Sequence, residues 1–295
     1  MKLSYGVKQM LLSTFYFAVM NVLIKMLTDI PPMEIVFFRC LLAAIFCFGL
    51  LARKKVSWLG HNRKLLLLRG FFGTLALFTY FITIKALPLG TAVTIQYISP
   101  VFTSIIGIFL VKESVKPLQW LFFAVSFAGV LIIKGFDFTI STQMLTIGLI
   151  SSVASAFAYN YVRSMKESED PIVVVLHFQL FGVVAGLVAA MFQWQMPSGN
   201  QWLILLAIGI LTQLGQTSLT LALQEERLAD VSILNYLGVL YALGFGILFF
   251  GEMYGISTIV GILFIIGGVL ANYYYKKRYE QSFIPENQAD HLHQT

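Results

Sequence analysis

The sequence has little charge: only 12% of its 295 residues are Asp, Glu, Lys or Arg, whereas 58% are hydrophobic. A soluble protein would carry about twice that share of charged residues. The composition therefore excludes a soluble globular protein and indicates a polytopic membrane protein. In such a chain the net charge of +6 does not indicate nucleic acid, and we expect no nucleic-acid partner.

Residues that bind metals or nucleotides are also scarce. The two cysteines, Cys40 and Cys47, lie seven residues apart in one apolar segment. On a helix this spacing is about 10 Å, which is too far for a disulfide. The sequence contains no CxxC motif, no Cys/His cluster and no GxxxxGK[ST] loop. We therefore expect no metal, no cofactor and no ATP-driven pump.

Acidic residues are missing from the centres of the apolar segments. A proton relay built on carboxylates is therefore not expected, and His177 is the one intramembrane candidate for proton coupling. We favour the alternative that His177 is a plain hydrogen-bonded histidine. An enzyme acting on lipid would need clustered histidines or carboxylates at membrane depth. Their scarcity indicates that the protein is not an enzyme, although a lipid-modifying enzyme and a channel are the alternative functions.

Long apolar runs make up most of the chain. A helix needs about 20 apolar residues to span a bilayer, and ten segments approach that length, at 7–27, 34–52, 66–86, 90–111, 117–134, 145–163, 171–193, 201–222, 228–250 and 256–275. Fifteen Lys and Arg residues fall in one set of connections, but only Lys85 and Lys134 in the opposite set. The positive-inside rule then predicts cytoplasmic termini in the plasma (bacterial inner) membrane. Residues 279–295 are predicted to form a disordered cytoplasmic tail.

A weak internal repeat has an offset of 139 residues, which pairs Asn21 with Asn160, Tyr97 with Tyr236 and Glu113 with Glu252. It predicts an N-terminal five-helix repeat over 1–136 and a C-terminal one over 137–278. Because five is odd, the second repeat enters the membrane from the opposite side, so the repeats are inverted. The predicted fold is thus an all-α polytopic membrane protein with ten transmembrane helices. Inverted repeats are typical of secondary transporters, which bind substrate between the halves.

Several stretches together resemble the EamA branch of the drug/metabolite transporter superfamily. They are "ALPLGTAVTIQYISPVFTSIIGIFLVKE" followed by "GVLII", then "FFRCLLA", "RGFFGT" and a weaker copy ending "LFFGE…GGVL". The resemblance covers residues 7–276. It implies two inverted five-helix repeats that move a small metabolite, such as an amino acid or a nucleoside-like or anionic compound, by alternating access. The motifs do not identify the substrate.

The fourth apolar segment contains the one mid-span proline, Pro100. Proline removes a backbone donor and clashes with the carbonyl four residues back, so Pro100 is expected to bend the helix at Gln96 and to act in gating. A freed carbonyl at membrane depth is tolerated only where protein or a water-filled cavity satisfies it. We therefore predict that Gln96, Pro100, Thr103 and Gly107 share a face that lines the transport path. Close packing of helices is the alternative.

Polar residues in other segments complete the predicted substrate site. The eighth segment carries a polar stripe at i, i+3, i+4 and i+7, formed by Gln213, Gln216, Thr217 and Thr220. Mid-span amides and tyrosines that could contact a planar substrate are Asn21, Asn160, Asn235, Tyr80, Tyr97, Tyr159 and Tyr236. For each amide alone, a structural hydrogen bond is the alternative.

Two cations, Lys25 and Arg39, lie near the outer ends of the first two segments. Charge inside a membrane is expensive and often functional. We predict that Arg39, which matches an arginine of the resembling family, attracts a carboxylate or phosphate on the substrate. The alternatives are that these side chains reach the outer interface, or that Arg39 pairs with Glu34. The expected partners are a small-molecule substrate and the lipid bilayer, and a homodimer is an open alternative.

Overall fold

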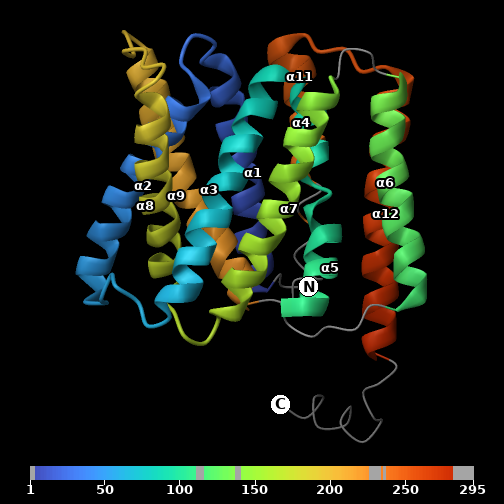
Figure 1. Ribbon diagram of the computed structural model, residues 1–295, viewed down its shortest axis with the longest axis horizontal. Helices are drawn as coiled ribbons and strands as arrows, with labels where there is room; N and C mark the ends of the chain where they lie inside the picture. The colour runs from blue at the N-terminus through green and yellow to red at the C-terminus, as the bar shows by residue number, and fades with distance from the viewer. Residues whose placement is uncertain (1–3, 111–115, 137–140, 226–233, 235–236, 282–295) are drawn as a thin grey trace, which may run out of the picture.

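The computed structural model describes residues 4–110, 116–136, 141–225, 234 and 237–281. The regular structure within these residues is helical throughout, which confirms the predicted all-α class. The helices run side by side (Figure 1). They are α1 (Tyr5–Met26), α2 (Pro32–Lys54), α3 (Arg63–Ala86), α4 (Leu89–Gln96), α5 (Ser99–Leu110), α6 (Pro117–Phe136), α7 (Thr142–Ser164), α8 (Pro171–Ala190), α9 (Gln201–Glu225), α11 (Leu237–Phe250) and α12 (Ile256–Gln281).

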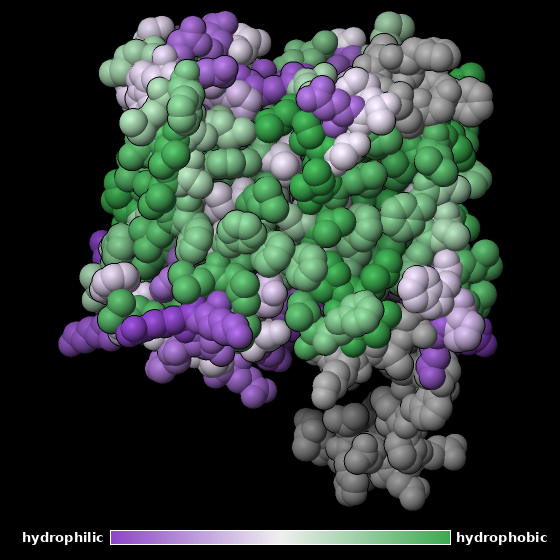
Figure 2. Space-filling model, viewed as in Figure 1, coloured by the Kyte–Doolittle hydropathy of each residue, from purple (hydrophilic) through white to green (hydrophobic). Residues whose placement is uncertain are grey.

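Most of these helices suit a bilayer in length and composition. In the described part of the chain, eight segments are long and apolar enough to cross a membrane, with α4 and α5 counted together as Leu89–Leu110. Two shorter apolar helices, Pro117–Ile132 and Leu237–Phe250, bring the total to the ten segments that the sequence predicts. Figure 2 shows a broad hydrophobic band between more hydrophilic ends. The chain is therefore a multi-pass membrane protein.

The helix boundaries follow from local sequence. Ser141 accepts a hydrogen bond from the amide of Met144 at 3.1 Å and caps α7, and Asp170 accepts one from Ile172 at 2.8 Å and caps α8. These side chains satisfy amides that have no partner within their own helix. At the other end of the chain α12 continues to Gln281, three residues into the segment expected to be disordered. Residues 282–295 lie outside the described residues.

The fourth segment is interrupted rather than bent. The helix α4 ends at Gln96, and α5 begins at Ser99, because Pro100 has no amide hydrogen for the carbonyl four residues back. The Ile95 carbonyl at this break accepts a hydrogen bond from Ser152 Oγ of α7 at 2.7 Å. The break therefore has a side-chain partner from a neighbouring helix, as backbone at membrane depth requires.

The helices of the first half, α1–α6, pack against those of the second half, α7–α12. The pairs in contact include α1 with α9, α2 with α8, α3 with α7, α4 with α11 and α6 with α12. The largest cluster of buried apolar residues draws on both halves and includes Ile35, Phe81, Ile95, Phe178 and Val239. The core therefore lies between the halves, around the cavity described next.

Candidate functional site

A cavity of about 110 Å³ lies between the two halves of the chain. Its walls come from α1, α2, α3, α4, α7, α8 and α9, with Tyr97 at the break between α4 and α5. This volume is enough for several water molecules and hence for a small polar molecule. The cavity is the candidate substrate site, and it contains seven of the residues that the sequence predicts.

Four of these seven belong to the first, third and fourth segments. Asn21, Tyr80, Gln96 and Tyr97 all line the cavity. Asn21 donates from Nδ2 to the Tyr80 hydroxyl at 2.9 Å, so two predicted residues are bonded to each other. The Asn21 Oδ1 atom has no partner within the described structure. This oxygen is therefore available to accept a hydrogen bond from a substrate.

Gln96 is held by two serines of α7. Ser151 Oγ donates to Gln96 Oε1 at 2.6 Å, and Gln96 Nε2 donates to Ser155 Oγ at 2.6 Å. Both ends of the amide are engaged, so its orientation is fixed. Of the face predicted from Gln96 to Gly107, only Gln96 lines the cavity. The hydroxyl of Thr103 instead donates to the Ser99 carbonyl of its own helix at 2.8 Å.

Two arginines dominate the charge of the cavity. Arg39 of α2 is 1% exposed and Arg69 of α3 is 3% exposed, and both line the cavity. The Arg69 Cζ atom lies 4.4 Å from the centre of the Phe178 ring. The Arg39 Cζ atom lies 6.0 Å from the same ring and 5.4 Å from that of Phe81. The two guanidiniums thus share one aromatic ring.

Neither arginine has an acidic partner among the described residues: the pairs of a basic and an acidic side chain within 4 Å there are Lys25–Glu252, Lys54–Asp170 and His61–Glu169. Arg39 Nε and Nη2 and Arg69 Nε also lack a hydrogen-bond partner there. The alternatives considered for Arg39 are wrong. It does not reach the interface, because it is buried, and the Glu34 carboxylate instead accepts from the Gln195 amide at 2.8 Å.

Tyr159 of α7 and Gln216 of α9 also line the cavity. The Gln216 Oε1 atom has no partner among the described residues, like Oδ1 of Asn21. The cavity wall thus combines positive charge with neutral amides and phenols. Within the described part of the chain it includes no Asp or Glu, and no three His, Cys, Asp or Glu residues cluster there as metal ligands would.

Other predicted residues lie away from the cavity. Asn160 Nδ2 donates to the Thr103 carbonyl at 3.2 Å and to the Ala156 carbonyl at 2.9 Å, so it joins α7 to α5. Gln213 accepts from Cys47 Sγ at 3.2 Å and donates to Thr217 Oγ1 at 3.0 Å. These polar atoms bond neighbouring groups of the helix packing, which was the alternative stated for Asn160.

Three more predictions concern His177, Asn235 and Tyr236. His177 does not line the cavity, and its Nδ1 lies 3.0 Å from the Val173 carbonyl one turn earlier in α8. Asn235 and Tyr236 lie outside the described residues.

The sequence reasoning missed Arg69, Phe178 and Ser155. A signal for Arg69 was present, because "LLLLRGFFGT" places one cation inside an apolar run. The position of Gly73, one turn later, gives this arginine its space. A Cβ at Gly73 would overlap the Arg69 guanidinium and lie 2.8 Å from Cδ2 of Phe178. No sequence pattern marks Phe178 or Ser155 apart from the many other phenylalanines and serines.

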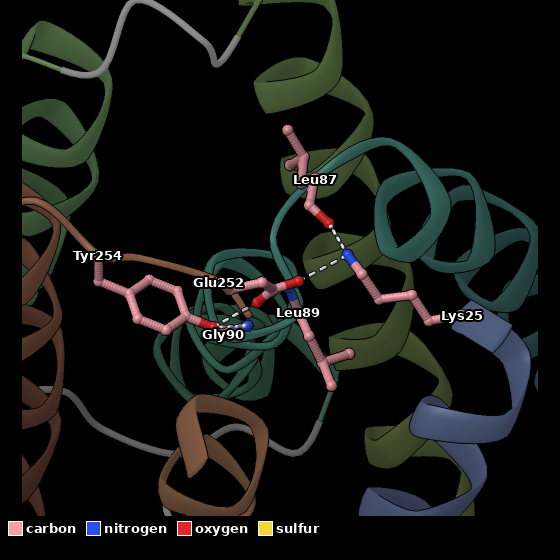
Figure 3. Close-up of polar contacts among 6 residues, drawn as sticks. All are labelled: Lys25, Leu87, Leu89, Gly90, Glu252 and Tyr254. Atoms are coloured by element: carbon pink, nitrogen blue, oxygen red, sulfur yellow. Dashed lines mark hydrogen bonds and ion pairs between the residues drawn. The ribbon is translucent and has the colours of Figure 1, made fainter. Parts of the chain in front are cut away.

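A second polar cluster joins the two halves at the end of the bundle where α1 ends and α4 begins (Figure 3). Lys25 Nζ forms an ion pair with Glu252 Oε1 at 2.8 Å and donates to the Leu87 carbonyl at 2.7 Å. The Glu252 carboxylate also accepts from the Leu89 amide, at 2.9 and 2.8 Å. It therefore places negative charge at the N-terminus of α4, which is favourable for the helix.

Tyr254, in the connection between α11 and α12, extends this cluster. Its hydroxyl donates to Glu252 Oε2 at 2.5 Å and accepts from the Gly90 amide at 3.1 Å. Burial, together with the hydrogen bond to the Glu252 carboxylate, raises the pKa of Tyr254, so the hydroxyl keeps its proton. One lysine, one carboxylate and one phenol thus connect α1, α4 and the α11–α12 connection.

Comparisons with known proteins match this architecture. The model of the EamA-like transporter family matches residues 4–135 and again residues 142–274. The chain is 31% identical to the pseudopaline exporter CntI of Pseudomonas aeruginosa, over 91% of this chain and 96% of that protein. It is 29% identical to the human solute carrier family 35 member G1, over 88% of this chain and 76% of that protein. A crystal structure at 17% identity superposes with a TM-score of 0.65, covering 93% of this chain and 97% of the other.

Proposed function

Because the chain belongs to the EamA-like transporter family, it is a secondary transporter of small metabolites, and we propose that its cargo carries a carboxylate or a phosphate. The observation that carries this proposal is the pair of buried arginines in a cavity without acidic side chains. The amides and tyrosines of the wall then serve as hydrogen-bonding groups for the rest of the molecule.

Energetics support an anionic cargo. Removing an ion from water costs several kcal/mol even after relaxation of the protein, and a guanidinium cannot escape this cost by losing its proton. The contacts of Arg39 and Arg69 with Phe81 and Phe178 each return on the order of 2 kcal/mol at such buried positions. The aromatic contacts are thus too weak to offset the burial of two cations, whereas an anion between them would offset it.

We propose that transport proceeds by alternating access between two inverted repeats, 1–136 and 137–278. The family model supports this division, because it matches the chain twice, once on each side of residue 137. The pattern of helix contacts supports it too. In the proposed repeats, α1, α2, α3, α4 and α6 correspond to α7, α8, α9, α11 and α12. If each helix is replaced by its counterpart, the α3–α7 pair becomes the α9–α1 pair, and the pairs α2–α8, α4–α11 and α6–α12 stay the same. A two-fold relation between the halves would produce this pattern, and it would place the cavity on the repeat interface.

The proposed orientation puts both termini in the cytoplasm of the plasma membrane. It is supported by the excess of Lys and Arg on one side of the predicted spans. In this orientation the cluster around Lys25 and Glu252 lies at the outer end. An ion pair that joins the halves there would keep that end closed until the repeats move.

Counterflow into proteoliposomes tests the proposed function. The probes are labelled succinate, glycerol 3-phosphate and butyrate, with a neutral sugar as a negative control. We expect saturable counterflow of at least one anion, which separates a carrier from a channel and from an enzyme.

The variant Arg39→Gln should weaken the apparent affinity for that anion about tenfold or more, since a charge-assisted hydrogen bond is lost. The matched control is Arg53→Gln, at an exposed arginine near the end of the same helix. Counterflow of the sugar alone would refute an anionic cargo, and no effect of Arg39→Gln would refute the role proposed for Arg39.

A further inference from the structure

We infer that the site takes a substrate with two negative charges, either two carboxylates on a short chain or one phosphate dianion. This inference rests on the proposed function, which requires only one charge. It adds the second arginine, Arg69, which lines the same cavity as Arg39 and contacts the same phenylalanine. The substrate class then follows from the charge balance of the cavity.

The charge count favours a dianion over a monoanion. The wall contributes two permanent positive charges, and it has no carboxylate among the described residues. A monoanion would neutralise one guanidinium and leave the other buried without a partner. A dianion would neutralise both, and the nitrogen atoms that lack partners, Arg39 Nε and Nη2 and Arg69 Nε, belong to these two side chains.

The same count disfavours a zwitterionic amino acid. Its ammonium group would bring a third positive charge into the cavity, where no acidic side chain of the described structure meets it. The rings of Phe81 and Phe178 lie against guanidiniums, so they offer poor positions for another cation. The neutral oxygens of Asn21 and Gln216 that lack partners suit hydroxyl or amide groups on the substrate instead.

Local packing leaves space for the side chain of the second arginine, Arg69. Gly73 lies one turn after Arg69, and any side chain there would overlap the Arg69 guanidinium and crowd Phe178. The absence of a side chain at Gly73 therefore leaves room for Arg69 in the cavity, beside the ring that it shares with Arg39. A stray interfacial cation would not need such space.

The test compares ligands that differ in charge and are similar in size. Thermal unfolding of the purified protein is followed with succinate, butyrate, glycerol 3-phosphate and inorganic phosphate, and competition for counterflow is measured with the same compounds. We expect succinate or a phosphate dianion to bind at least about tenfold more tightly than butyrate, the value of one additional charge-assisted contact. A preference for succinate indicates two carboxylates, and a preference for either phosphate compound indicates one phosphate group.

Variants connect the preference to Arg69. In Arg69→Gln the ratio of succinate or phosphate affinity to butyrate affinity should fall about tenfold, because one cation is gone. Arg69→Lys keeps the charge and should retain the preference, which provides a second variant if the glutamine variant does not fold. The control, Arg53→Gln, changes an exposed arginine outside the cavity and should leave the ratio unchanged.

The outcomes separate this inference from the proposed function. If butyrate binds and is transported as well as the dianions, the inference is wrong but an anion transporter remains. The inference is also wrong if the dianion preference survives in Arg69→Gln. If none of the anions binds or is transported while a neutral compound is, the proposed function fails along with the inference.

Discussion

At the scale of the single residue, Gly73 leaves the space that the Arg69 side chain occupies in the proposed anion site. The nearest atoms to a Cβ placed there are Nη1 of Arg69 and the ring of Phe178. The Gly73→Ala variant should therefore displace the guanidinium, because the arginine is the more flexible neighbour. Overpacking of this kind costs about 1–3 kcal/mol, so we expect the apparent affinity for the transported anion to fall about tenfold. Transport kinetics in proteoliposomes measure this change.

The matched control for Gly73→Ala is Gly49→Ala in α2, where a Cβ would meet no atom within 4 Å. It should leave both transport and thermal stability near those of the parent protein. If Gly73→Ala transports with unchanged affinity, the present position of the Arg69 guanidinium is not needed for binding of the anion. If the variant loses stability but not affinity, the glycine serves packing alone.

Residues of the cavity were predictable from sequence to the extent that they stand out from their surroundings. Arg39 is a lone cation in an apolar run, and the amide of Gln96 lies beside a mid-span proline, so both could be identified. Arg69 follows Arg63 and Lys64 by only a few residues, which hides it behind the basic connection. Asn160 and Gln213 also stand out in apolar runs, but they do not line the cavity, because their amides bond neighbouring groups outside it. A polar residue in an apolar segment is therefore not sufficient to predict a site residue.

At the scale of the secondary-structure element, the interrupted segment α4–α5 places Gln96 and Tyr97 in the cavity wall. In Pro100→Ala the new amide could donate to the Gln96 carbonyl, and the helix could become continuous. We expect a gain in thermal stability of at most about 3 kcal/mol, the usual cost of proline inside a helix. We also expect a several-fold slower initial transport rate, because residues 96 and 97 would turn relative to the cavity.

The control for this variant is Pro117→Ala. Pro117 begins α6, where a proline disturbs no hydrogen bond within the helix. It should change neither stability nor the transport rate by much. A Pro100→Ala protein that transports at the parent rate would show that the break is only a packing feature, maintained by contacts such as that of Ser152 with the Ile95 carbonyl.

The element scale also explains which part of the fold could be predicted. Length and hydropathy identify ten spans, and they succeed because the bilayer imposes one length on every helix. They do not reveal that the fourth span is split at 97–98, since the run stays apolar across the break. The position of Pro100 indicates a defect in the helix. Whether a helix bends or separates there depends on neighbouring groups, here Ser151, Ser152 and Ser155 of α7.

At the scale of the whole molecule, ion pairs join the two halves at both ends of the bundle, but they differ in burial. At one end Lys25 and Glu252 are 17% and 10% exposed, and at the other Lys54 and Asp170 are 50% and 22% exposed. Exposed ion pairs contribute about 0–1 kcal/mol, whereas breaking a buried pair costs more, because a charge is left without its partner. We therefore expect ion pairing to hold closed the Lys25–Glu252 end, which is the proposed outer end.

This difference leads to a prediction for Glu252→Gln. The variant keeps the shape of the side chain but leaves Lys25 unpaired, so the outer end should open more often. A reporter cysteine in Asn21→Cys, combined with Cys40→Ala and Cys47→Ala, lies one helical turn from Lys25 on the cavity wall. An impermeant thiol reagent applied to intact cells should label this cysteine about tenfold faster when Glu252→Gln is present, given a loss of about 1–3 kcal/mol in the closed state. Lys54→Gln breaks the exposed pair at the opposite end and should leave the labelling rate unchanged.

Equal labelling rates with and without Glu252→Gln would mean that the cluster stabilises the fold without controlling access to the cavity. Faster labelling only from the cytoplasmic side, in inverted vesicles, would reverse the proposed orientation.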